Sequence, residues 1–131
     1  MLKYYIFLVI NLILHEIGHF LALKIFKINI EYIVIGNGLY LKIKKIKISP
    51  IILTCHIEFL IKEYKKLNLI KRLIIIISGP LVNFIIFVSL PNEYIVYKYI
   101  SLLIFLNSLI PIPFFNTDGM NIFKEIFKSK K

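Results

Sequence analysis

The sequence predicts an α-helical membrane protein, with three transmembrane helices and a small cytoplasmic β-sheet inserted between the first two. Composition gives the first indication: the 131 residues are 59% hydrophobic, with a mean hydropathy of +0.82. Soluble domains are about 45–50% apolar, and so short a chain buries too little surface to hide this excess in one core. The other two indications are long apolar stretches and a strand-like segment between them. A single domain over residues 1–131 is expected.

Three apolar stretches approach the roughly 20 residues that a helix needs to cross a bilayer. They cover about residues 4–26, 73–90 and 94–115. The first fourteen residues also resemble a secretory signal peptide, with Lys3 ahead of an apolar run. No small-residue cleavage site follows them, and polar residues interrupt the place where the apolar run should end. A retained first span is therefore the favoured interpretation.

Residues 29–59 have the composition of β-strands, rich in Ile, Val, Tyr and Leu. Apolar and basic residues alternate strictly over residues 41–44, as in a half-buried strand. Gly36-Asn37-Gly38 predicts a tight hairpin turn between the first two strands. Three strands and a short amphipathic helix are expected, over residues 29–35, 39–48, 51–59 and 60–68. We expect this sheet at the membrane face.

Basic residues are distributed unevenly around the predicted spans. Eight lysines lie between Lys27 and Lys66 and four follow the third span, whereas residues 91–93 contain none. Cytoplasmic loops are enriched in Lys and Arg, so we expect the β-region and C-terminal tail in the cytoplasm and the N-terminus outside. The net charge of +10 does not indicate nucleic-acid binding, because the basic residues form no stripe with interleaved aromatic side chains.

The segment His15-Glu16-Ile17-Gly18-His19 lies within the first predicted span. Residues four apart on a helix share a face, so two imidazoles can bind one zinc ion while Glu16 lies beside the water that the metal activates. A charged side chain at mid-membrane costs about 2.5–3.5 kcal/mol on the insertion scale, which favours a functional interpretation. The alternative is a buried polar cluster that holds helices together.

Catalytic zinc usually has three protein ligands and keeps a fourth position for water. Asp118 is the preferred third ligand, because it is the only Asp in the chain and follows the third span. An Asp before Gly can also be a simple turn residue. His56, in the predicted sheet, and Asn116 are the alternative ligands.

The second and third spans contain residues that interrupt helices. Gly79-Pro80 and Asn83 lie in the second, and Asn107, Pro111 and Pro113 lie in the third. Proline removes a backbone donor, and the freed polar backbone must be satisfied inside the protein or by water in a cavity. Together with the histidines, these residues predict a hydrated pocket at membrane depth. Plain helix kinks are the alternative.

Taken together, these motifs resemble the site-2 protease family of intramembrane metalloproteases. The family has HExxH in one core span, Gly-Pro-x-x-Asn in the next and Asn…Pro…Asp-Gly in the third. Here the three motifs are His15–His19, Gly79–Asn83 and Asn107–Gly119. The short bacterial branch, which includes the sporulation protease acting on a sigma-factor precursor, is the most similar. One departure is that Asp118 follows Pro111 by seven positions rather than about five.

The resemblance implies a zinc metalloendopeptidase. His15, His19 and Asp118 would bind Zn²⁺, Glu16 would be the catalytic acid/base, and Asn83 would line the pocket and steady the substrate or its oxyanion. The substrate would be a membrane-anchored protein, cut in or near its transmembrane segment to release a cytosolic product. A strand edge of the sheet is suited to hold the unwound substrate by β-addition.

The resemblance also places the chain as an integral protein of a bacterial cell membrane, or of a forespore-type membrane. A regulatory membrane partner or a second copy of the chain is an expected associate. Two other functions stay open: a non-catalytic membrane-protein binder of the same fold, and an intramembrane metal or proton carrier. A carrier needs a polar path to both faces, and the outer halves of spans two and three offer little beyond Ser89, Asn92 and Glu93.

Overall fold

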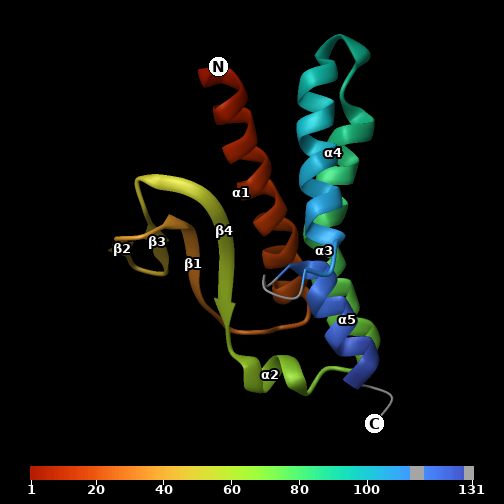
Figure 1. The fold of residues 1–131 in the computed structure, drawn as a ribbon. Helices are drawn as coiled ribbons and strands as arrows, with labels where there is room; N and C mark the ends of the chain where they lie inside the picture. The colour runs from red at the N-terminus through yellow and green to blue at the C-terminus, as the bar shows by residue number, and fades with distance from the viewer. Residues whose placement is uncertain (113–116, 129–131) are drawn as a thin grey trace.

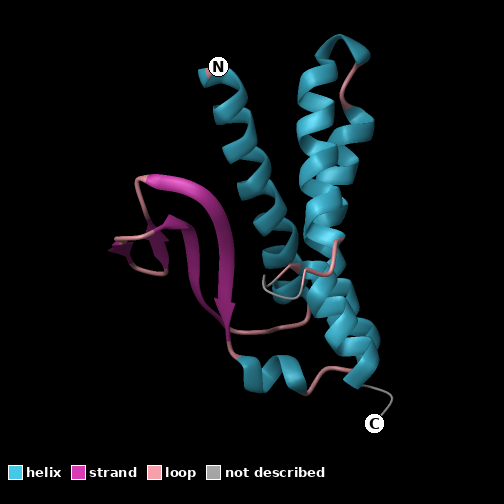
Figure 2. Ribbon diagram, in the orientation of Figure 1, coloured by secondary structure: helices cyan, strands magenta, loops and turns pink. Residues whose placement is uncertain are grey.

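The computed structural model describes residues 1–112 and 117–128, and combines a helical bundle with a β-sheet on one side of it (Figures 1 and 2). The helices are α1 (Leu2–Ile25), α2 (Ile61–Lys65), α3 (Leu69–Ser89), α4 (Ile95–Leu109) and α5 (Asp118–Lys128), with a 3₁₀ turn η1 (Asn92–Tyr94). The strands are β1 (Ile30–Asn37), β2 (Leu41–Ile43), β3 (Ile46–Ile48) and β4 (Ile51–Phe59).

Among the described residues, α1 and α3 are the two helices long and apolar enough to cross a membrane. They coincide with the first two predicted spans to within a few residues. Only 28% of the most apolar stretch of either helix is buried, and large side chains such as Leu21 and Ile85 are more than half exposed. Apolar surface of this extent indicates a membrane protein, because lipid rather than the protein interior must cover it.

The second span is less interrupted than the sequence suggested. Helix α3 continues through Pro80, which is buried in its middle. Because proline has no backbone N–H, the Ile76 carbonyl loses its usual donor within the helix. The remaining backbone hydrogen bonds keep α3 continuous.

Helix α4 ends at Leu109, well before residue 115, where the third span was expected to end. Its 15 residues give a length of about 22 Å, shorter than the roughly 30 Å hydrocarbon core. The helix stops because Ile110 precedes a proline and takes an extended ψ of 122°. Pro113 and the last part of the predicted span lie outside the described residues. The third crossing therefore stays a prediction.

The four strands form one sheet in the order β2-β3-β1-β4. Strand β1 is antiparallel to β4 and parallel to β3, and β2 pairs with β3. The hairpin predicted at Gly36-Asn37-Gly38 is therefore wrong. Gly36 and Gly38 have φ of 91° and 101°, conformations that glycine adopts readily, and here they turn the chain away from β1. The tight turn lies instead between β2 and β3, where Lys44 has a φ of 53°.

The sheet lies along α1 rather than at one end of it. The Tyr5 hydroxyl donates a hydrogen bond to the Ile52 carbonyl (3.3 Å), so β4 begins beside the first turns of α1. At the other end, Phe59 packs against the buried core, which contains Leu23 of α1 and Ile30 of β1. One face of α1 therefore packs against the sheet and another packs against α3.

Helix α5 joins the end of the chain to α3 and α4. A side chain at Gly119 would collide with the Leu109 carbonyl, so glycine lets α5 begin against the end of α4. Arg72 Nη1 donates to Glu125 Oε2 (2.6 Å), which ties α5 to α3. The sequence showed only a basic tail here, and the structure makes it the helix that carries Asp118.

Candidate metal centre

His15 and His19 lie one turn apart on the face of α1 that packs against α3. Glycine makes this contact close: a side chain at Gly18 would collide with the Ser78 carbonyl. Both imidazoles are largely buried, with 9% and 13% of their side-chain surface exposed. The sequence spacing of four residues thus places the two rings together, as expected for one helical face.

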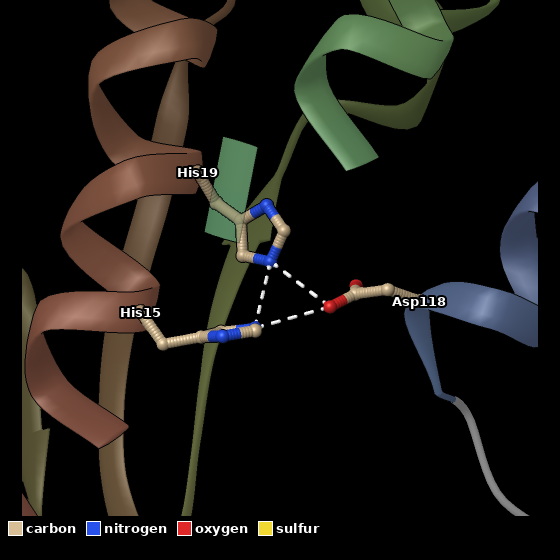
Figure 3. Close-up of side chains that lie close together, drawn as sticks. All are labelled: His15, His19 and Asp118. Atoms are coloured by element: carbon tan, nitrogen blue, oxygen red, sulfur yellow. Dashed lines mark hydrogen bonds and ion pairs between the residues drawn. The ribbon is translucent and has the colours of Figure 1, made fainter. Parts of the chain in front are cut away.

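Three potential ligand atoms converge at this point (Figure 3). The Nε2 atoms of His15 and His19 are 3.2 Å apart. Oδ2 of Asp118 lies 3.0 Å from the first and 3.4 Å from the second. The carboxylate comes from the start of α5, so the first and last helices of the chain form one cluster.

The opposite ring nitrogens of both histidines face oxygen atoms. His15 Nδ1 is 2.5 Å from Oδ1 of Asn83, and His19 Nδ1 is 2.7 Å from the Ile75 carbonyl oxygen. A carbonyl oxygen can only accept, so Nδ1 of His19 is the donor, and in the neutral imidazole Nε2 then carries the lone pair. For His15 the same conclusion depends on how the Asn83 amide is oriented.

Asn11 fixes the orientation of Asn83. The Asn83 amide nitrogen donates to the backbone carbonyl and to Oδ1 of Asn11, both at 3.3 Å. Because a backbone carbonyl cannot donate, the NH₂ group faces Asn11 and the oxygen faces His15. Ser101 of α4 donates to Asn11 Oδ1 (2.9 Å), so the support reaches across three helices. All three supporting side chains are fully buried.

When both imidazoles are neutral, three electron-pair donors point at one another: two Nε2 atoms and a carboxylate oxygen. A metal ion or a shared proton between them would remove the repulsion of their lone pairs. The absence of a side chain at Gly79 leaves space beside the two imidazoles, since a Cβ there would collide with the Nε2 atoms of both histidines. The cluster has the donors and the space to hold a metal ion.

Glu16 is half-buried and lies between the two histidines in sequence. Among the described residues, none donates a hydrogen bond to its carboxylate. The group is therefore free to take part in proton transfer, in contrast to the Asp118 carboxylate, which faces both imidazoles.

The structure separates the remaining candidates from this cluster. Asn83 lies behind His15 with no exposed surface, so it supports the ring from inside and does not line open space as expected. His56 lies on β4 with 53% of its side chain exposed, 3.8 Å from Glu58. Asn107 is exposed on α4, and Asn116 lies outside the described residues.

Sequence reasoning missed Asn11 and Ser101. A usable signal was present for the first: Asn11 is a polar residue within an apolar stretch, four positions before His15 and so on the same helical face. Ser101 gave no comparable signal, because a serine in an apolar helix often bonds only to its own backbone.

A scan against protein-family models finds a match to peptidase family M50 over residues 3–91. The match covers about two thirds of the chain and includes the histidine motif, the sheet and Asn83, but ends before Asp118. No curated protein matches the sequence significantly. The family match agrees with the sequence motifs and with the metal-binding geometry of α1. The chain belongs to peptidase family M50, the site-2 protease family.

Proposed function

We propose that this protein is an intramembrane zinc metallopeptidase in which His15, His19 and Asp118 bind the metal and Glu16 is the general base. One observation carries the proposal: three potential ligand atoms converge, and the contacts of both Nδ1 atoms orient the Nε2 atoms toward the Asp118 carboxylate. Membership of a peptidase family supports peptide hydrolysis as the reaction.

The donor set suits zinc. Nitrogen and oxygen ligands lie about 2.0–2.2 Å from zinc, so neighbouring ligands of a tetrahedral ion are about 3.3–3.6 Å apart. The three atoms here are 3.0–3.4 Å apart. Two histidines and one carboxylate also leave a fourth position open, as in catalytic zinc sites.

Each residue has a distinct part in the proposed reaction. Zinc, when bound, supplies Lewis-acid activation of water and of the scissile carbonyl. Glu16 accepts the proton of the attacking water and delivers it to the leaving amine nitrogen. Asn83 holds the His15 ring with Nε2 toward the metal, a role of the kind that outer hydrogen-bond partners have in metal sites.

The proposed substrate is a membrane-anchored protein, and the expected product is released into the cytosol. The exposed apolar surfaces of α1 and α3 support a site within the bilayer. The lysines between Lys27 and Lys66 and those of the tail support a cytoplasmic position for the C-terminal end of α1, for α2 and for the tail, with α4 as the third crossing. The start of β4, beside the first turns of α1, then lies toward the other side. A regulatory membrane partner or a second copy of the chain belongs to the same proposal.

Metal content of the purified full chain tests the assignment. Asp118→Asn should lose much of its zinc, because an amide oxygen is a poor substitute for a charged ligand. Glu16→Gln is the matched control: it also removes one carboxylate but should keep the metal while losing cleavage of a membrane-anchored reporter. Equal zinc affinity in Asp118→Asn and the parent, or full turnover by Glu16→Gln, would contradict the proposal.

A further inference from the structure

A cavity of about 240 Å³ lies between α1 and the sheet, beside Glu16. Its walls come from both sides, and no polar atom contributes to its surface. The lining includes Ile13, Ile17 and Phe20 of α1, and Ile33, Cys55 and Ile57 of the sheet. Glu16 borders it through its carbon atoms.

The sheet and α1 could have packed tightly here, and near the end of the helix they do. Ala22 and Leu23 are buried against Ile28 and Ile30. One to two turns earlier the same interface stays open, although Ile33 and Ile57 are direct cross-strand partners on the sheet face. The gap is therefore local to the stretch of α1 that carries Glu16.

Helix geometry places Glu16 at the border between this cavity and the metal cluster. Each residue turns the helix by about 100°. Glu16 is therefore about 60° from His19 on one side and about 40° from Phe20 on the other. A group in the cavity is next to Glu16, and Glu16 is next to the imidazoles.

We propose that this cavity is a substrate subsite, which receives one large aliphatic or aromatic side chain adjacent to the bond that is cut. The inference rests on the proposed function, because Glu16 relates the cavity to catalysis. Apolar cavities of roughly 150 Å³ bind a benzene ring, so this space accommodates a leucine or phenylalanine side chain. Its apolar walls would leave a charged side chain without partners.

Binding of zinc-directed probes tests the subsite without the natural substrate. The probes are peptide hydroxamates that differ in one side chain: hydrogen, methyl, isobutyl or benzyl. On the zinc-loaded full chain in micelles, the isobutyl and benzyl members should bind at least about ten-fold more tightly than the hydrogen member, as for added carbons in an apolar pocket. Cys55→Phe, which fills the cavity, should abolish this preference and leave the hydrogen member unaffected.

Cys55 supplies a second readout, because it is the only cysteine in the chain. Burial raises the pKa of its thiol to about 11, so alkylation is followed at alkaline pH. The isobutyl and benzyl members should slow alkylation at least about five-fold, and the hydrogen member should not. The control is His56→Cys in a Cys55→Ala chain, since residue 56 points to the opposite face of β4 and should gain no protection.

The outcomes separate the two proposals. Equal binding of all four hydroxamates overturns the subsite and leaves the metal site intact. Equal protection of Cys55 by all four has the same consequence, because it means that lipid or detergent fills the cavity. If no hydroxamate binds, the proposed function is wrong and the subsite falls with it. Should Cys55→Phe also lose the hydrogen member, Ile46→Ala decides, because Ile46 also lines the cavity. Enlarging the cavity should favour benzyl over isobutyl, and an unchanged ratio overturns the subsite.

Discussion

Asn83 is a neutral side chain that determines which nitrogen of a neighbouring histidine carries the proton. Its oxygen accepts from His15 Nδ1, and Asn11 prevents the amide from turning over. Both amides are fully buried, and a hydrogen bond in such a low-dielectric interior is electrostatically stronger than one in water. The side of His15 that faces His19 and Asp118 is thus oriented by residues outside the cluster.

Replacing Asn83 should weaken zinc binding without removing a ligand. Asn83→Ala leaves His15 Nδ1 without its acceptor, and loss of an outer partner typically costs 10–100-fold in metal affinity. Competition with a chelating dye measures this change. Asn83→Asp, which keeps an acceptor oxygen, should recover most of the affinity.

Ser101→Ala is the matched control for this prediction. It removes the far end of the same network, three hydrogen bonds from His15, and should change zinc affinity less than Asn83→Ala. Equal affinities for Asn83→Ala and the parent would show that His15 keeps its tautomer unaided.

The residues of the cluster were predictable to different degrees. His15 and His19 were identified from spacing alone, because a helix fixes which residues share a face. Asp118 was expected despite its unusual distance from Pro111. The structure accommodates the extra residues because Thr117 Oγ1 donates to the Ile110 carbonyl (2.8 Å), which brings the two ends of the connecting segment together. Such a tertiary contact has no signature in the sequence.

At the level of elements, composition predicted the existence of strands better than their partners. The predicted strand over residues 51–59 is β4, with the same bounds. Alternation over residues 41–44 indicated a strand but not that β2 pairs with β3, since side-chain period carries no information about neighbours. For β1 and β3 to pair in parallel, the chain must run back along the sheet between the two strands, a path that the local sequence pattern does not specify.

Strand β4 is one edge of the sheet, which makes it testable as a substrate-binding strand. Proline introduced at two alternating sets of positions should separate its roles. One set disturbs pairing with β1, and the other removes only outward-facing donors. We expect the second set to reduce cleavage of a membrane-anchored reporter while zinc content is unchanged. If neither set affects cleavage, the substrate does not add to β4.

Metal removal should loosen helix α5 selectively. Asp118 is the first residue of this helix and would lose its partner in the cluster, while the Arg72–Glu125 pair still holds the later turns. Hydrogen exchange should show faster opening of the first turns in chelator-treated protein, by up to about 100-fold relative to zinc present at 100 times Kd. Helix α2, which contributes no residue to the cluster, is the internal control. Uniform acceleration of both helices would indicate global destabilisation instead.

For the whole molecule, the path of the chain across the membrane depends on α4. If α4 crosses, a reporter fused after Lys131 should be cytoplasmic and one inserted at Asn92 should be outside. Twelve of the seventeen basic residues lie either between Lys27 and Lys66 or in the tail. Accessibility labelling of intact cells distinguishes the two sides. A shared location for both reporters would mean that the short helix α4 does not cross.

The ligands of the cluster are separated by 103 residues, from His15 to Asp118. Ribosomes add roughly 5–20 residues per second, so His15 is made about 5–20 s before its carboxylate partner. During that interval the nascent chain has both histidines of the cluster but not Asp118. Synthesis of the final helix is then the step that completes the centre. A chain terminated before residue 117 should consequently insert its first helix yet leave neighbouring membrane proteins uncut.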